Sequence, residues 1–302
     1  MTINRVAIIG LGLLGGSIGL ALRERAPGIA TTGFDADPNV RAVATDRDLV
    51  GTVCETPGEA VAEADLVILC VPVGAMGDAA RAFADALPEG AIVSDVGSSK
   101  RHVAEALAEA LPGHTIIPAH PVAGTEQSGP EAGFATLFAN RWCILTPPAD
   151  AEEDKVEVLA NFWRGLGARI EIMDAEHHDL VLAVTSHIPH LIAYTIVGTA
   201  SDLEDVTRSE VIKYSAGGFR DFTRIAASDP VMWRDVFLSN KTAVLEMLGR
   251  FTEDLTALQR AIRSGDGDTL HDLFDRTRAI RRSIIEEGQD DERPDFGRED
   301  HI

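Results

Sequence analysis

The motif HPVAGTE at residues 120–126 directly follows a short apolar segment, residues 115–119, that is typical of a parallel strand. Ligands in parallel α/β sheets bind beyond the carboxyl ends of the strands, so we expect His120 to project into a binding crevice. A histidine with a near-neutral pKa suits the removal of a proton from a hydroxyl group while a hydride leaves the same region. The alternative is a histidine whose ring is bonded by a loop carbonyl, but its position favours catalysis.

A second polar segment, GSSK at residues 97–100, also follows a strand-like segment. Ser98 could bind a substrate hydroxyl or orient His120, and Lys100 could supply positive charge to an anionic ligand. The serines could also cap the helix that follows, because serine is common at that position. The two roles are compatible.

The segment from Lys213 to Trp233 contains Arg220 and Arg224, which are four residues apart and could face the same way on a helix. In an acidic protein, an arginine beside a cleft is suited to bind a carboxylate with two hydrogen bonds. A surface ion pair is the commoner alternative. Two consecutive glycines, residues 217–218, would destabilise a helix interior, so we expect them in a turn or a close approach.

Two pairs of histidines remain. His187 and His190 are three residues apart and could ligate a metal, but no third ligand is near in sequence and Pro189 distorts the spacing. We therefore expect no metal, and favour a substrate-facing or structural role. The pair at residues 177–178 we interpret as helix surface.

The N-terminus carries the full pattern of a dinucleotide-binding fold. Residues 5–9 predict a buried strand, the glycines of GLGLLG follow at 10–15, a helix covers 16–25, and a second strand over 30–34 leads to an aspartate. The glycines allow a tight turn, an approach of the backbone to a pyrophosphate and close packing of helix on strand. The aspartate would bind a ribose 2′-hydroxyl and repel a 2′-phosphate, which favours NAD. The candidate cofactor-binding residues are Gly10, Gly12, Leu14, Gly15 and Asp35.

Strand-like segments alternate with helical ones as far as residue 173, which predicts a doubly wound sheet. The later strands are expected at residues 64–71, 91–96, 115–119, 142–146 and 168–173. Strand signals then stop. Asp174 should cap a helix that starts at Ala175, and Pro189 should kink or split that helix.

Asp229 and Pro230 should begin a further helix that carries a stripe of apolar residues at steps of three and four, after one step of seven. The stripe consists of Phe237, Val244, Leu248, Phe251, Leu255, Leu258 and Ile262. It could face an internal core or a dimer partner equally well. The fold class is thus α/β, with a Rossmann-like dinucleotide-binding domain at 1–173, an all-helical domain at 174–287 and a disordered acidic tail at 288–302.

Composition excludes several classes of partner. The chain has 302 residues, with 27 Lys and Arg against 48 Asp and Glu, and a net charge of −21, which argues against nucleic acid and anionic membranes. The longest apolar run, residues 66–73, is too short to span a membrane, and we expect no signal peptide, because a strand begins almost at once. Three cysteines without a paired motif indicate reduced thiols in the cytoplasm.

The chain resembles the prephenate/arogenate dehydrogenases of tyrosine biosynthesis over about residues 4 to 285. The resemblance rests on the motifs GLGLLGGS at 10–17, DVGSSK at 95–100, HPVAGTE at 120–126, SHIPH at 186–190, and GGFRDFTRIA through WRD at 217–235. The last motif is far more specific than the glycine pattern.

The resemblance implies an N-terminal Rossmann-like domain, an all-helical C-terminal domain that makes a homodimer, and oxidative decarboxylation of a cyclohexadienyl acid with NAD. It also implies that His120 takes the proton of the ring hydroxyl, that Ser98 contacts that hydroxyl and the histidine, and that Arg224 binds a substrate carboxylate. The other implied substrate-binding residues are His187, Glu126 and Trp233, the last of which could reach across the dimer.

Three questions stay open. The substrate could be prephenate, with a keto group on its side chain, or arogenate, with an ammonium group, and Glu126 does not decide between them. A β-hydroxyacid or imine-reducing dehydrogenase has the same two-domain plan, although the His120 motif speaks against it. A non-catalytic NAD-binding regulator would bind NAD without turnover.

Overall fold

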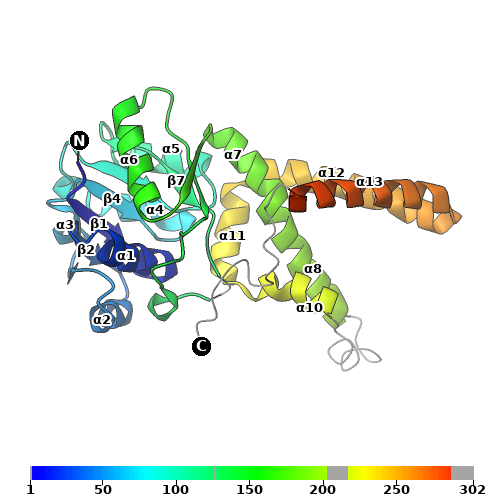
Figure 1. Cartoon of the computed structure of the whole chain (residues 1–302), viewed down its shortest axis with the longest axis horizontal. Coiled ribbons are helices and arrows are strands. Elements are labelled where there is room, and N and C mark those ends of the chain that lie inside the picture. The colour runs from blue at the N-terminus through cyan, green and yellow to red at the C-terminus, as the bar shows by residue number, and fades with distance from the viewer. Residues whose placement is uncertain (1, 126, 203–216, 287–302) are drawn as a thin grey trace. The chain divides into compact units, whose positions relative to one another are not determined.

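The computed structural model describes residues 2–125, 127–202 and 217–286, and the chain divides into two compact units, residues 1–245 and 246–302 (Figure 1). The expected domain boundary at residue 173 falls inside the first unit, where the last strand ends and the helical region begins. The acidic tail expected at 288–302 lies outside the described residues.

A six-stranded parallel sheet forms the centre of the first unit, with the strand order β3-β2-β1-β4-β5-β6 of dinucleotide-binding folds. The expected strands at 5–9 and 30–34 are confirmed residue for residue. The six strands are β1 (Arg5–Ile9), β2 (Ala30–Phe34), β3 (Thr52–Val53), β4 (Leu66–Leu69), β5 (Ile92–Asp95) and β6 (Thr115–Ile116).

Helices cover both faces of this sheet, and a separate apolar cluster lies on each face. The strands β4 and β5 are buried along their whole length, as strands in a sheet with two covered faces must be. The helices are α1 (Leu13–Arg25), α2 (Pro38–Asp46), α3 (Pro57–Val61), α4 (Met76–Arg81), α5 (Arg101–Ala110) and α6 (Glu153–Gly165).

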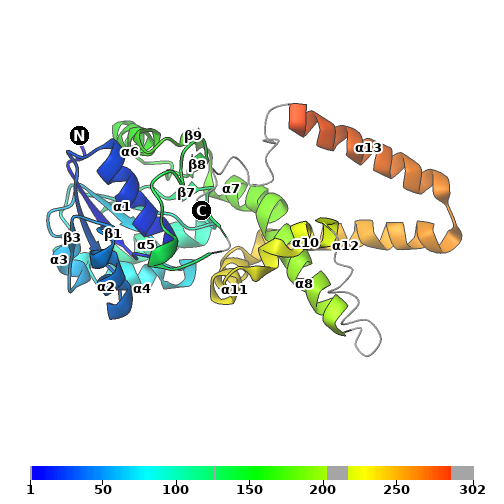
Figure 2. The ribbon, with the colours of Figure 1, turned by 60° about the horizontal axis from the view of Figure 1, so that its bottom comes forward.

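The last strands do not extend the parallel sheet, contrary to the sequence expectation of one continuing series. A separate three-stranded sheet contains β7 (Ala119–Pro121), β8 (Trp142–Leu145) and β9 (Arg169–Ile172), beside α6 (Figure 2). Within it β7 pairs antiparallel with β8, and His120 lies opposite Ile144. The segment 115–119 is therefore split between two sheets, and His120 lies in an antiparallel strand rather than beyond a parallel one.

The helical region begins as the sequence predicts. The Asp174 carboxylate accepts a hydrogen bond from the His177 N–H at 2.8 Å and caps α7 (Ala175–Leu182). Ahead of Pro189 the helix widens into a π-helical turn, Ala183–His187, and continues as α8 (Ile188–Asp202). The paired glycines at 217–218 form the first turn of α10 (Gly217–Thr223), which is followed by the 3₁₀ helix η6 (Arg224–Ala227).

The single long helix expected after Asp229 is two helices. As predicted, Asp229 caps α11 (Pro230–Ser239), because its carboxylate accepts a 2.8 Å hydrogen bond from the Met232 N–H. This helix ends at Asn240, and a second helix, α12 (Lys241–Ser264), follows it. The expected apolar stripe is thereby divided: Phe237 lies on α11, and the six residues from Val244 onward lie on α12. The last helix described is α13 (Gly267–Glu286).

Two glycines of the first turn differ in what surrounds them. A Cβ at Gly15 would overlap the carbonyl oxygen of Gly10, whereas a Cβ at Gly12 would meet no protein atom within 4 Å. We therefore expect Gly15→Ala to lower the free energy of unfolding by about 1–3 kcal/mol, because the backbone on both sides must move. Gly12→Ala should change it by less than about 0.5 kcal/mol. Urea denaturation followed by circular dichroism measures both, and equal stabilities would contradict this packing.

Candidate active site

The first turn of α1 has the features of a pyrophosphate-binding site. Gly12 is the N-cap residue of α1, and among the described residues no side chain caps this helix end and no acidic side chain lies in its first turn. The N–H groups at Leu14 and its neighbours are thus available to an anion. Packing does not require a glycine at residue 12, because its Cβ would meet no protein atom. The close approach of a phosphate to the backbone does require a glycine at residue 12. NAD therefore fits this site.

Asp35 lies at the end of β2, half-buried beside the same turn. Its carboxylate accepts hydrogen bonds from the N–H groups of Leu11, at 2.8 Å, and of Asp37, at 3.0 Å. These bonds fix the carboxylate at the edge of the turn and tie β2 to it. The structure therefore brings the glycines and Asp35 together as the sequence predicts.

His120 is 8% exposed and its ring contacts the helical region. Its Nδ1 lies 2.9 Å from Nε2 of His178 on α7. Burial lowers the pKa of His120 well below its usual value, and the positive charges of Lys100 and of protonated His178 and His187 add to this effect. The ring is consequently neutral at neutral pH, which is the form that can accept a proton.

A buried ion pair holds the strand that carries His120. Lys100 and Asp95 are both fully buried and bonded to each other, and Nζ of Lys100 also donates to the Ala119 carbonyl at 2.7 Å. Asp95 accepts from the N–H groups of Ala119, at 3.2 Å, and of Gly97, at 2.7 Å. Burial raises the pKa of Asp95 and lowers that of Lys100, and their attraction opposes both shifts. The expectation that Lys100 offers charge to a ligand is wrong, since its side chain lies inside the protein.

The two serines ahead of Lys100 have different surroundings. Ser98 is half-buried in the turn between β5 and α5, on the side of His187. Ser99 is buried, and its hydroxyl lies 2.8 Å from the hydroxyl of Ser239 on α11. Ser99 therefore joins the sheet to the helical region, while Ser98 lies near His187.

His187, expected to face the substrate, is fully buried. Nδ2 of Asn240 lies 3.1 Å from its Nδ1 and also donates to the carbonyl oxygen of Asp179 at 2.7 Å. Burial lowers the pKa of His187 to about 4, although Asp179 acts in the opposite direction. Its full burial and its contact with Asn240 place His187 in the interior of the site.

His190 lies nearer the surface than His187. It is half-buried, and its ring stacks on Trp233 with centroids 3.7 Å apart. Burial lowers the pKa of His190, its hydrogen bond to the Ser186 carbonyl raises it, and the positive charge of Arg224 lowers it further. Trp233 is 6% exposed within its own chain, and Arg224 is exposed in η6. The sequence analysis favoured a substrate-facing or structural role over a metal site for His190, as for His187.

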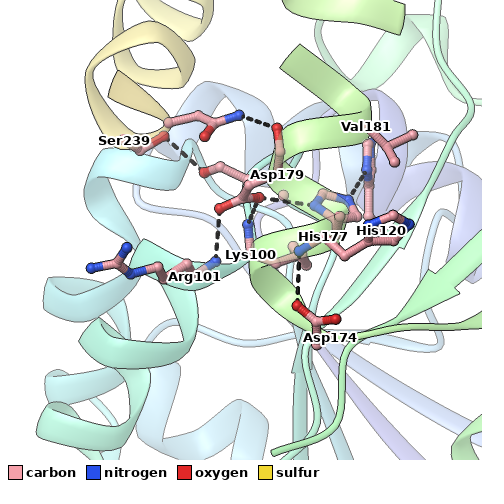
Figure 3. Close-up of polar contacts among 12 residues, drawn as sticks. Lys100, Arg101, His120, Asp174, His177, Asp179, Val181 and Ser239 are labelled. Atoms are coloured by element: carbon pink, nitrogen blue, oxygen red, sulfur yellow. Dashed lines mark hydrogen bonds and ion pairs between the residues drawn. The ribbon is translucent and has the colours of Figure 1, made fainter. Parts of the chain in front are cut away.

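His178 and Asp179 are the site residues that sequence reasoning missed. The pair at 177–178 was interpreted as helix surface, which is correct for His177 but wrong for His178, whose side chain is fully buried. The signal available was the helical spacing, because His178 lies four residues before the buried Leu182 and therefore on its face. Figure 3 shows Asp179 bonded to the backbone of Lys100 and Arg101, and the His178 ring connects Asp179 to His120.

The remaining sequence expectations have mixed outcomes. Glu126 lies outside the described residues. Within the described ranges, no group of three potential metal ligands is present. All three cysteines are free, and burial raises the pKa of Cys70 and Cys143, so these two thiols are poor nucleophiles.

One helical stretch, Ala175–Asp202, is long and apolar enough to span a membrane by length and composition, which the sequence analysis did not anticipate. The same stretch carries His178, Asp179 and His187, whose polar groups are bonded within the first unit. We assign it to the globular unit, because these groups belong to the site and pair with residues of the sheet and of α11.

Comparison with known proteins gives a consistent set of matches. The family model described as "Prephenate dehydrogenase, nucleotide-binding domain" matches residues 18–172, and that described as "Prephenate dehydrogenase, dimerization domain" matches residues 174–276. Cyclohexadienyl dehydrogenase of Zymomonas mobilis is 45% identical over 281 residues, which cover 93% of this chain and 96% of the relative. Prephenate dehydrogenase of Bacillus subtilis is 32% identical, over 93% of this chain and 76% of the relative.

The fold is similar to a solved structure as well. The crystal structure of prephenate dehydrogenase from Aquifex aeolicus in complex with hydroxyphenyl propionate and NAD+ aligns with a TM-score of 0.87 at 32% identity. The alignment covers 94% of this chain and 99% of that one.

The lowered pKa of His187 predicts a pH-dependent stability. The unfolded chain binds this proton near pH 6.5 but the folded chain only near pH 4, so the folded state is fully favoured above about 6.5 and loses stability as pH falls toward about 4. The loss attributable to this residue is up to about 3 kcal/mol. Urea denaturation between pH 7.5 and 4.5 measures it.

The variant His187→Asn keeps an acceptor for Asn240 and removes the titration, so its stability should fall less steeply with acid. His177→Asn, at an exposed histidine, is the matched control and should keep the wild-type slope. If His187→Asn and the wild-type protein lose stability in parallel, His187 is not responsible.

Proposed function

Because the chain belongs to the prephenate dehydrogenase family, we propose that it oxidises and decarboxylates prephenate, arogenate or both, with NAD as the hydride acceptor. The observation that carries this proposal is a buried neutral histidine, His120, in the same unit as a glycine turn suited to a dinucleotide. The names of the relatives support both acids, since the Zymomonas mobilis protein is called a cyclohexadienyl dehydrogenase and a Synechocystis structure is called an arogenate dehydrogenase.

His120 acts as the general base in this proposal. When bound, NAD accepts the hydride from the ring carbon that bears the hydroxyl group. His120 takes the hydroxyl proton, and Ser98, in the adjacent turn, contacts the same hydroxyl. Loss of the ring carboxylate then yields an aromatic ring, so the chain mainly has to position the substrate and hold one proton. The burial of His120 excludes water from the step.

Arg224 would bind a substrate carboxylate through its guanidinium group. It lies close to His190, which stacks on Trp233, so the three residues can line one end of the substrate site. We include His190 here beside His187, which lies deeper and is retained from the sequence motif. Glu126 is retained from the sequence motif as a further candidate.

We further propose that residues 1–173 bind the cofactor and that residues 174–287 help to bind the substrate and form a cytoplasmic homodimer. The matched model for 174–276 is named for dimerisation, and large apolar side chains are exposed on the helices of this region. They include Ile196, Val197, Leu255, Ile262, Phe274 and Ile280. Three free cysteines fit a reducing compartment.

Reduced-cofactor formation should be measured in four combinations, prephenate or arogenate with NAD or NADP. We expect turnover with NAD and at least one acid, and at least about tenfold weaker use of NADP, because Asp35 repels the 2′-phosphate. The matched variant Asp35→Asn should reduce the preference for NAD. Failure of the wild-type enzyme in all four combinations, with NAD still bound, would overturn the proposed function.

His120→Asn should lower kcat by about 10²-fold or more and leave the Kd for NAD nearly unchanged, because the side chain accepts the hydroxyl proton but does not hold the cofactor. Steady-state kinetics and NAD titration by protein fluorescence measure the two quantities. Near-normal turnover in this variant would rule out His120 as the base.

Sedimentation equilibrium should give a mass about twice the 32.3 kDa of one chain. Replacing Ile262 by aspartate puts a charge on the exposed apolar face and should weaken the dimer, whereas Arg263→Asp, at the next position, serves as the control for added negative charge. A monomer at all concentrations in the wild-type protein would contradict the dimer.

A further inference from the structure

Two side chains beyond the base, His178 and Asp179, form a continuous hydrogen-bonded chain with it inside the first unit. His120 Nδ1 lies 2.9 Å from His178 Nε2, and His178 Nδ1 lies 2.9 Å from Oδ1 of Asp179. We propose that His178 and Asp179 are positioning residues that fix which ring nitrogen of His120 carries the proton. This inference rests on the proposed function of His120 as the base.

Asp179 is the fixed end of the chain. Its Oδ1 accepts from the Lys100 N–H at 2.7 Å, and its Oδ2 accepts from the Arg101 N–H at 3.1 Å, at the N-terminus of the ten-residue helix α5. Both oxygens are therefore occupied as acceptors, which favours the carboxylate, and the positive end of the helix dipole stabilises it. Its backbone carbonyl is held by Asn240.

The carboxylate determines the tautomer of His178. Oδ1 of Asp179 can only accept, so Nδ1 of His178 must carry the hydrogen, because two lone pairs facing each other at 2.9 Å would repel. In the neutral ring the other nitrogen, Nε2, is then an acceptor.

The tautomer of His120 follows in the same way. Since Nε2 of His178 accepts, Nδ1 of His120 must donate, and the lone pair of the His120 ring is then on Nε2. The chain thus presents one defined basic nitrogen on the side of His120 that faces away from His178. A His120 ring without this partner would share its proton between both nitrogens.

The same contacts stabilise the state after proton transfer. When Nε2 of His120 takes the substrate proton, the ring becomes positively charged, with Nδ1–H still donated to His178. The negative Asp179 lies one ring further along and attracts this charge, while the buried Lys100 opposes it. The groups that face His178 are His120, Asp179, Lys100 and Asp95.

The positions of His178 and Asp179 also distinguish their positioning role from direct contact with the cofactor. His178 is fully buried on α7 and Asp179 is 5% exposed, whereas the cofactor turn lies at the start of α1. Removal of the His178 ring nitrogens should therefore change kcat and leave the KM for both substrates nearly unchanged.

The variant His178→Phe keeps a ring of similar shape and removes the acceptor, and we expect kcat to fall by about 10²-fold with little change in KM. His178→Gln restores an acceptor oxygen for His120 and should recover at least about tenfold of the loss. His177→Phe makes the same exchange at the exposed neighbouring histidine and should retain wild-type kinetics. Wild-type kcat in His178→Phe would overturn the proposal.

A measurement on the wild-type protein avoids any dependence on how the variants fold. In protein labelled with ¹⁵N at histidine, with His120→Asn used to assign the signals, Nδ1 of His120 should show the shift of a protonated nitrogen and Nε2 that of a bare one. A bare Nδ1 would overturn the proposal even if turnover is normal. If the wild-type enzyme is inactive with both acids, the proposed function fails while the tautomer is still determined.

Discussion

The active-site half of the molecule depends on one buried ion pair. Asp95 and Lys100 come from the two ends of a single turn, yet together they bind both the N–H and the carbonyl of Ala119, the residue before His120. A strand of three residues cannot hold its place by sheet pairing alone. The ion pair transfers the rigidity of the parallel sheet to β7, and removing either partner would leave an uncompensated buried charge at a cost of about 3–5 kcal/mol.

From this anchor the site is assembled by contributions from two kinds of structure. The sheet supplies His120, Ser98 and the cofactor turn, and the helices supply His178, Asp179 and His190. Two further contacts connect them: the hydroxyl pair of Ser99 and Ser239, and the bonds from Asp179 to the start of α5. The proposed base, His120, therefore has its His178 partner only when the helical segment is docked on the sheet.

The sequence predicts the individual strands, helices and helix caps better than the contacts between segments that are distant in the chain. The strands β1 and β2, both aspartate caps and the glycine turn follow from local rules of spacing and backbone geometry, and all of them are present. The antiparallel placement of β7 and the break at Asn240 depend on contacts between distant segments, which local pattern does not contain. For the same reason Lys100 was expected to offer its charge to a ligand and instead lies inside, since burial of a polar residue depends on a partner found only in three dimensions.

The widened turn at Ala183–His187 has a consequence for the shape of the site. His178 and His187 are nine residues apart, and in a regular α-helix they would project about 180° away from each other. One additional residue in the turn takes up about 100° of that rotation, so both rings reach the buried side of the same helix. The second histidine thus owes its interior position to an insertion in the backbone. A chain with one residue fewer here would form a more regular helix and would turn that ring away from Asn240.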